Sequence, residues 1–103
     1  MIIYVSAPYT LGNLIINVKN ACEAGNLLLD KGHVPLIPHL MMLWELHSPK
    51  PYSEWMRICL ALLGKCDALL RLEGFSKGAD IEVKIAKEAG IPVYFNLQEV
   101  PNV

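Results

Sequence analysis

The chain has 103 residues, enough to bury one hydrophobic core and too few for two, so residues 1–103 are predicted to form a single domain. Hydrophobic residues make up 53% of the chain and charged residues 18%, a composition that excludes intrinsic disorder. Nine Lys and Arg residues face ten Asp and Glu residues, for a formal net charge of −1. This balance argues against nucleic acid or an acidic membrane as a partner.

The cysteines indicate the compartment. Cys22, Cys59 and Cys66 are odd in number and contain no CxxC pair, which favours reduced thiols in the cytoplasm over a disulfide framework. The chain starts without a basic leader, and no apolar run approaches the roughly 18 residues that span a bilayer. We therefore expect a protein that is neither secreted nor membrane-bound. Its apolar composition favours a homodimer or a higher homo-oligomer, because large exposed apolar patches usually mark contacts.

Strands and helices alternate along the chain. β-branched and aromatic runs bounded by turn residues predict four strands, at residues 2–5, 34–37, 67–72 and 91–95. Apolar residues at helical spacing predict three helices, at residues 13–31, 53–66 and 79–89. Asn13 and Ser53 are the expected N-caps of the first two helices, and Gly25 is expected to pack closely on the sheet. Residues 39–52 are predicted to be irregular.

This alternation predicts an α/β fold, a small Rossmann- or flavodoxin-like three-layer sandwich. Its parallel sheet of about four strands, in the order 2-1-3-4, has helices on both faces. In that order the chain reverses direction between the first and third strands, and a crevice opens beyond their carboxyl ends. Residues 6–13 and 73–78 form the loops that reach this crevice. The topology alone therefore predicts a ligand site in these two loops.

Glu82 is the best candidate for catalysis. On a helical wheel it falls at the edge of the inward face, beside the small residues Ala79 and Ala86. A carboxylate near the positively polarised start of a helix is stabilised as an anion and directed at the crevice. A second interpretation stays open, in which Glu82 only complements the helix dipole.

Several polar residues of the two loops are candidates for binding the substrate. Ser76, Lys77 and Gly78 precede the last helix, where free backbone amides suit a phosphate or a sugar hydroxyl; Ser76 is equally suited to cap the helix. Tyr4 and Tyr9 flank the first loop. Each is expected either to pack its ring against apolar neighbours or to orient a carboxylate with its hydroxyl. The first loop also contributes Ser6 and Pro8.

The motifs of several enzyme classes do not occur. The sequence has no GxxxxGK[ST] loop and no GxGxxG motif, which leaves no ground for an ATPase or a dinucleotide-dependent oxidoreductase. His33, His39 and His47 are scattered, without HxxxH or HExxH spacing. We therefore predict neither a metal nor a cofactor.

Four segments together resemble one family. They are YVSAPYT at residues 4–10, GHVPLIPH at 32–39, KCDALLRL at 65–72 and SKGADIE at 76–82. They resemble the nucleoside 2-deoxyribosyltransferase-like superfamily, particularly its short members and, more distantly, the 2′-deoxynucleoside 5′-phosphate N-hydrolases. The resemblance covers nearly the whole chain, in the same order and with compatible spacing.

The resemblance implies roles for particular residues. It makes Glu82, in the SxGxxxE arrangement with Ser76 and Gly78, the nucleophile that attacks the anomeric carbon and forms a glycosyl-enzyme. Tyr4 matches the first-strand tyrosine near the nucleophile, and Ser76 matches the serine that contacts the 5′-phosphate in the hydrolases. The family's proton-handling aspartate lies eight residues before the aspartate of the third strand, and here that position is Cys59. A buried thiol is a poor acid for protonating a leaving base.

The sequence therefore predicts an N-glycosidic bond hydrolase or transferase that acts on nucleosides, deoxynucleosides or their 5′-monophosphates. The first alternative is a protein that binds a nucleotide without turning it over, which Cys59 favours. A purely structural interaction domain is the second alternative.

Overall fold

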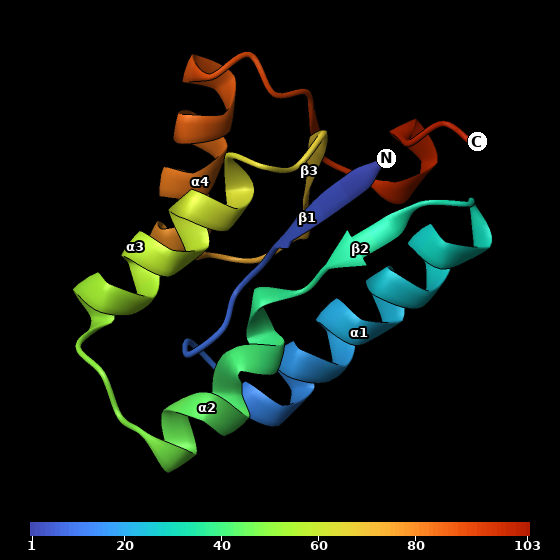
Figure 1. Cartoon of the computed structure of the whole chain (residues 1–103). Helices are drawn as coiled ribbons and strands as arrows, with labels where there is room; N and C mark the ends of the chain where they lie inside the picture. Colours follow the sequence, from blue (N-terminus) through green and yellow to red (C-terminus); the bar gives the residue numbers. More distant parts are fainter.

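The computed structural model describes all residues, Met1–Val103, and shows an α/β fold (Figure 1). Four parallel strands form one sheet in the order β2-β1-β3-β4, as predicted. The strands are β1 (Ile2–Ser6), β2 (Val34–Leu36), β3 (Ala68–Arg71) and β4 (Val93–Tyr94). The α-helices are α1 (Leu14–Asp30), α2 (Met42–His47), α3 (Tyr52–Leu63) and α4 (Lys77–Glu88). Two 3₁₀ helices, η1 (Pro38–Met41) and η2 (Leu97–Glu99), complete the fold.

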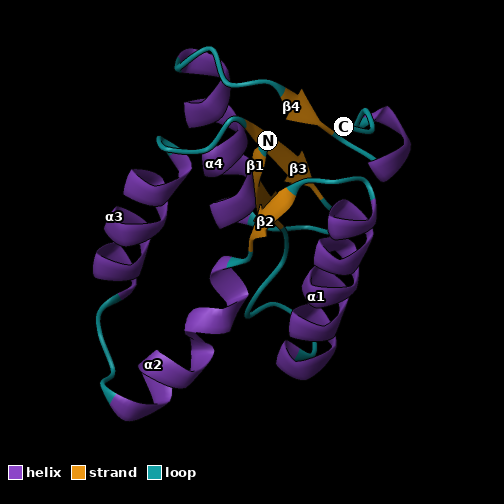
Figure 2. Cartoon of the chain, turned by 45° about the vertical axis from the view of Figure 1, so that its right-hand side comes forward, coloured by secondary structure: helices purple, strands orange, loops and turns teal.

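Helices cover both faces of the sheet, which confirms the three-layer prediction (Figure 2). Side chains alternate along a strand, so β1 sends Ile3 and Val5 toward α1. Tyr4 belongs to the second core cluster, with side chains of α3 and α4. Tyr4 and Ser6 both have no exposed surface. Strand β1 thus carries the hydroxyl groups of Tyr4 and Ser6 on the face of the sheet that α3 and α4 cover.

The first helix follows its sequence signals. The Asn13 side chain caps α1 by accepting a hydrogen bond from the Ile16 N–H. Gly25 lies on the buried face of α1, and a Cβ atom there would lie 2.6 Å from Cδ1 of Ile37 and 3.6 Å from Cβ of Pro35. The predicted close approach of α1 to the sheet is confirmed, since a larger side chain would displace Ile37.

The structure corrects the prediction for residues 39–52, which are largely helical rather than irregular, in η1 and α2. A helix as short as α2 depends on tertiary contacts and leaves little periodicity in a sequence. Here Glu45 accepts hydrogen bonds from the Trp55 indole N–H and the Lys50 backbone N–H. Ser53 does not cap α3, because the helix begins at Tyr52 and Pro51 is in the cap position. The fixed φ of proline suits that entry.

The last strand is shorter than predicted, with two residues instead of five. Pro92 has no N–H to donate, although its carbonyl accepts a hydrogen bond from the Leu69 N–H. The Ile91 N–H donates a hydrogen bond to the carbonyl of Ala86, near the end of α4, and not to β3. Val93 and Tyr94 pair with β3, and the chain bends at Phe95. None of the helices is both long and apolar enough to cross a membrane.

The loops after β1 and β3 meet through Pro8 and Gly74. Gly74 has a φ of +117°, a conformation that residues with a Cβ rarely adopt. A Cβ atom at Gly74 would also lie 2.7 Å from Cγ of Pro8. The two loops that the topology assigned to the ligand site are therefore in contact.

Gly74→Ala is expected to destabilise the protein by about 1–3 kcal/mol, because it combines a strained backbone with a clash against Pro8. Chemical denaturation measures this loss. Gly64→Ala is the matched control, since the φ of Gly64 is −61° and its Cβ would meet the carbonyl oxygen of Ala61 at an ordinary 3.5 Å. Equal stabilities of the two variants would contradict the prediction.

Candidate active site

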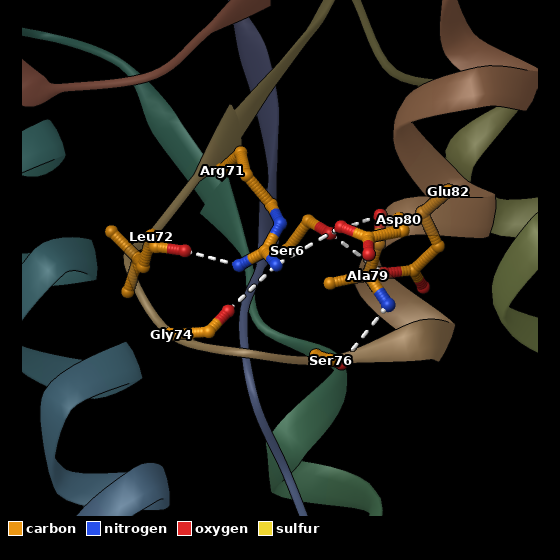
Figure 3. A network of polar contacts seen from close by, with 8 residues as sticks. All are labelled: Ser6, Arg71, Leu72, Gly74, Ser76, Ala79, Asp80 and Glu82. Atoms are coloured by element: carbon orange, nitrogen blue, oxygen red, sulfur yellow. Dashed lines mark hydrogen bonds and ion pairs between the residues drawn. The ribbon is translucent and has the colours of Figure 1, made fainter.

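Two elements position the polar centre of the molecule, β1 and α4. β1 ends beneath the first turns of α4, where the Ser6 Oγ lies 3.5 Å from the carbonyl oxygen of Ala79. One turn further along the helix, Glu82 points down to the sheet and is only 8% exposed (Figure 3). The helical wheel placed Glu82 at the edge of the inward face, and in the structure it is among the buried residues of α4.

Two hydroxyl groups hold the Glu82 carboxyl group. The Tyr4 hydroxyl donates a hydrogen bond to Oε2. The Ser6 hydroxyl donates one to Oε1 over 2.8 Å. A buried carboxyl group with one donor on each oxygen is fixed in orientation, and each oxygen keeps a further lone pair. This Tyr4–Ser6–Glu82 cluster is the candidate active site.

Burial raises the pKa of Glu82 above its ordinary value of 4.5. The hydrogen bonds from Tyr4 and Ser6 and the charge of Arg71 act in the opposite direction and favour the carboxylate. The pKa of the Tyr4 hydroxyl is raised, first by burial and then by the charge of Glu82. Tyr4 therefore keeps its proton and remains a donor to Glu82 at neutral pH.

Cys59 of α3 also belongs to this cluster. It packs against the core cluster that contains Tyr4, and the Tyr4 hydroxyl and the charge of Glu82 act in opposite directions on the pKa of its thiol. Burial raises the pKa of the Cys59 thiol. The thiol is therefore protonated and weakly acidic at neutral pH.

Arg71 was not among the residues that the sequence analysis selected. It ends β3 with a side chain that is only 10% exposed, and its guanidinium donates hydrogen bonds to the carbonyls of Leu72 and Gly74. The same group pairs with Asp80 at 3.2 Å (Figure 3). Arg71 thus ties the β3–α4 loop to the first turn of α4 and places a positive charge near Glu82. A charged residue that ends the apolar strand ALLR is the pattern that could have revealed it.

The structure gives Ser76 the role of a helix cap. Its Oγ accepts a hydrogen bond from the Ala79 N–H over 3.1 Å, which is the alternative that the sequence left open. Lys77 is exposed at the start of α4. A Cβ atom at Gly78 would lie 3.1 Å from the Tyr52 hydroxyl oxygen, so Gly78 lets α3 approach α4 closely.

Pro8 and Tyr9 belong to a neighbouring cluster around His39. The His39 Nε2–H donates to the carbonyl of Pro8 over 2.8 Å, and the rings of Tyr9 and His39 meet edge to face with centroids 5.2 Å apart. Burial lowers the pKa of His39, so the ring is neutral at physiological pH. His39 is 4% exposed and fixes the β1–α1 loop, a role that its spacing in the sequence did not indicate.

Two hollows lie near the carboxyl ends of the strands. One of about 170 Å³ opens between the loops after β1 and β3, on the side of α1. It is lined by Ala7, Pro8, Asn17, Asn20, Leu72 and Glu73. A wider one of about 490 Å³ lies along the outer side of α4, where it includes Arg71 and Phe95. The first confirms that a crevice opens where the topology placed it, whereas Glu82 itself lies on the opposite face of β1.

His, Cys, Asp and Glu side chains nowhere gather in the threes that a metal ion requires. The chemistry available at the site is that of the carboxylate, two hydroxyls and a thiol.

The comparisons with known proteins agree with this fold. The sequence model of a family described as "Domain of unknown function (DUF7768)" matches residues 1–96, so the chain belongs to that family. No curated protein matches.

Among solved structures, the chain is similar to the 2-deoxyribosyltransferase from the psychrotolerant bacterium Bacillus psychrosaccharolyticus, with a TM-score of 0.66 and 19% sequence identity. The alignment covers 95% of this chain and 79% of that one. The expected resemblance to deoxyribosyltransferases is thus confirmed as a likeness of fold.

The raised pKa of Glu82 makes stability depend on pH in a defined direction. The folded state binds the Glu82 proton more tightly than the unfolded chain, so this residue lowers stability as pH rises from 4.5 through the raised pKa. Glu82→Gln lacks this titration and keeps an acceptor for Tyr4 and Ser6. From pH 4 to 7.5 the melting temperature of the wild type should therefore fall relative to that of Glu82→Gln. A difference that is constant with pH, or that moves the other way, would contradict the assigned burial of the carboxyl group.

Proposed function

We propose that this protein cleaves the N-glycosidic bond of nucleosides, deoxynucleosides or their 5′-monophosphates, as a hydrolase or a transferase, with Glu82 as the nucleophile. The observation that carries the proposal is the buried Glu82 carboxyl group held by the Tyr4 and Ser6 hydroxyls. The likeness of fold to a 2-deoxyribosyltransferase supports the same class of substrate. The three free thiols are consistent with a cytoplasmic protein.

The contacts of Glu82 suit attack on a sugar carbon. A nucleophilic carboxylate must be ionised, oriented and shielded from water. The two hydroxyls and Arg71 favour the ionised form, and burial beneath α4 limits hydration. Attack on C1′ gives a glycosyl ester, which water resolves in a hydrolase and a second base resolves in a transferase. The loops after β1 and β3, with Pro8, Tyr9 and residues 76–78, are the proposed walls for the sugar and its phosphate.

A second candidate is a nucleotide-binding protein without turnover. The observation that favours it is Cys59, a thiol of raised pKa beside the Tyr4–Ser6–Glu82 cluster. Release of an ordinary base is slow unless a positioned acid protonates it, and such acids contribute about 10²–10⁴-fold.

Glu82→Gln is expected to abolish base release from a deoxynucleoside 5′-monophosphate while the protein still binds the nucleotide. Chromatography measures the free base. Binding is followed by the rise in melting temperature, since ligand at 100 times its dissociation constant stabilises by about 2.7 kcal/mol. Glu88→Gln changes an exposed glutamate of the same helix and serves as the control. Base release that survives in Glu82→Gln would refute the nucleophile, and the absence of any thermal shift in the wild type would refute the nucleotide site.

We also propose that the protein forms a homodimer or a higher homo-oligomer. Exposed apolar side chains gather on α2 and just before it, where Leu43 is 70% and Leu46 is 72% exposed, with Leu40 at 58% and Trp44 at 47%. Leu43→Ser with Leu46→Ser should then shift sedimentation at micromolar concentration from an oligomer toward a monomer. A wild type that sediments only as a monomer would contradict this assembly.

A further inference from the structure

The protons available around Glu82 restrict the bases that this site can release. Breaking a C1′–N bond leaves an electron pair on the base, and a neutral purine or pyrimidine departs readily only if an acid protonates it. The question is therefore which group near Glu82 can give a proton at neutral pH.

The groups that contact or act on Glu82 are poor proton donors to a leaving base. Tyr4 and Ser6 direct their protons at the Glu82 carboxylate itself. Arg71 is a permanent cation whose protons are used by two loop carbonyls and Asp80. Cys59 is a half-buried thiol, and burial raises its pKa, so it gives up its proton less readily than a free thiol.

The carboxyl groups of the adjacent helices have other partners. Glu54, at the start of α3, accepts hydrogen bonds from Arg57, which lowers its pKa and leaves it ionised at neutral pH. Asp80 forms an ion pair with Arg71 (Figure 3). The Tyr52 hydroxyl lies beside Gly78, and a phenol is a far weaker acid than a carboxylic acid.

Resting on the function proposed above, we infer that the substrates of this site are nucleosides or nucleotides whose base is already positively charged, such as an N7-alkylated purine or a pyridinium. Such a base leaves without a proton. The Glu82 carboxylate bonds to C1′ as the C1′–N bond breaks, and the electron pair of that bond neutralises the cationic ring. Water then attacks C1′ and releases Glu82, and the water proton passes to solvent.

The charge of the site fits a cationic base as well. Glu82 is a buried carboxylate whose ionised form is disfavoured by burial. A positive charge within a few ångströms stabilises the ionised form. The substrate itself would therefore help to ionise its nucleophile, an effect that a neutral base does not supply.

The test compares two substrates that differ by one methyl group, 2′-deoxyguanosine 5′-monophosphate and its 7-methyl derivative. Release of each base by the wild type is measured against Glu82→Gln, which provides the uncatalysed rate. We expect catalysed release of 7-methylguanine and little or none of guanine. The kcat/KM for the methylated substrate should rise with pH as Glu82 ionises and then stay level. Nicotinamide mononucleotide, a pyridinium, tests whether the preference extends beyond purines.

Substitution of Cys59 provides a second test of the inference. Cys59→Asp places a carboxyl group beside Tyr4 and should raise guanine release by about 10²–10⁴-fold, while release of 7-methylguanine changes by less than about 3-fold. Cys22→Ser, at a partly buried cysteine of α1 outside the cluster, is the control and should match the wild type with both substrates. If Cys59→Asp does not fold, the comparison of the two substrates with the wild-type protein still tests whether the site releases only a cationic base.

Three outcomes would overturn the inference. The first is equal catalytic acceleration of guanine and 7-methylguanine release by the wild type, and a loss of guanine release in Tyr52→Phe would then identify the acid. The second is guanine release by Cys59→Asp when the wild type releases neither base, which retains the proposed function and rejects the cationic substrate. The third is binding of the nucleotides without release by any variant, which also rejects catalysis. Absence of binding altogether would reject the proposed function itself.

Discussion

The structure depends on how one carboxyl group is kept beneath a helix. Burying Glu82 without partners would cost several kcal/mol, and the Tyr4 and Ser6 hydroxyls offset that cost by donating to its two oxygens. This contact joins residues 78 positions apart in the chain. It fixes which way β1 faces, because a shift of one residue along β1 would direct Ile3 and Val5 at Glu82 instead. The central strand, the start of α4 and the polar cluster are therefore one unit.

A second set of contacts holds the loops around that unit. Arg71 bonds to the carbonyls of Leu72 and Gly74, and His39 bonds to the carbonyl of Pro8. Gly74 and Pro8 then meet at a distance that leaves no room for a Cβ atom. Both loops are held by side chains that come from outside the loops themselves, so the loops that we propose as walls of the site are held in place by contacts within the protein.

The sequence was sufficient for the features that local pattern and general topology determine. Alternating strands and helices predicted the sheet order 2-1-3-4, and the helical wheel placed Glu82 at the inward edge of its helix. The contact of His39 with Pro8 could not be predicted, since it joins segments 31 residues apart that only the fold brings together. The contacts of Arg71 are local in sequence, but which backbone carbonyls its guanidinium reaches depends on the conformation of the loop. The short helix α2 was missed because it is stabilised by Glu45, Trp55 and Lys50 rather than by periodicity. Ser76 was ambiguous, because a capping serine and a phosphate-binding serine occupy the same position before a helix.

The fold and the chemistry proposed for this site depend on different features of the sequence. A fold shared at 19% sequence identity needs only the apolar pattern and the turns, which many residue choices satisfy. Nucleophilic attack would need Glu82 ionised; the hydroxyls and Arg71 favour that form, but burial outweighs them and raises the pKa of Glu82. Departure of the base needs a proton or a positive charge, and position 59 carries a thiol whose pKa burial raises. If the site acts as proposed, the substrate must supply this positive charge, and the charge of the base would then decide between turnover and binding.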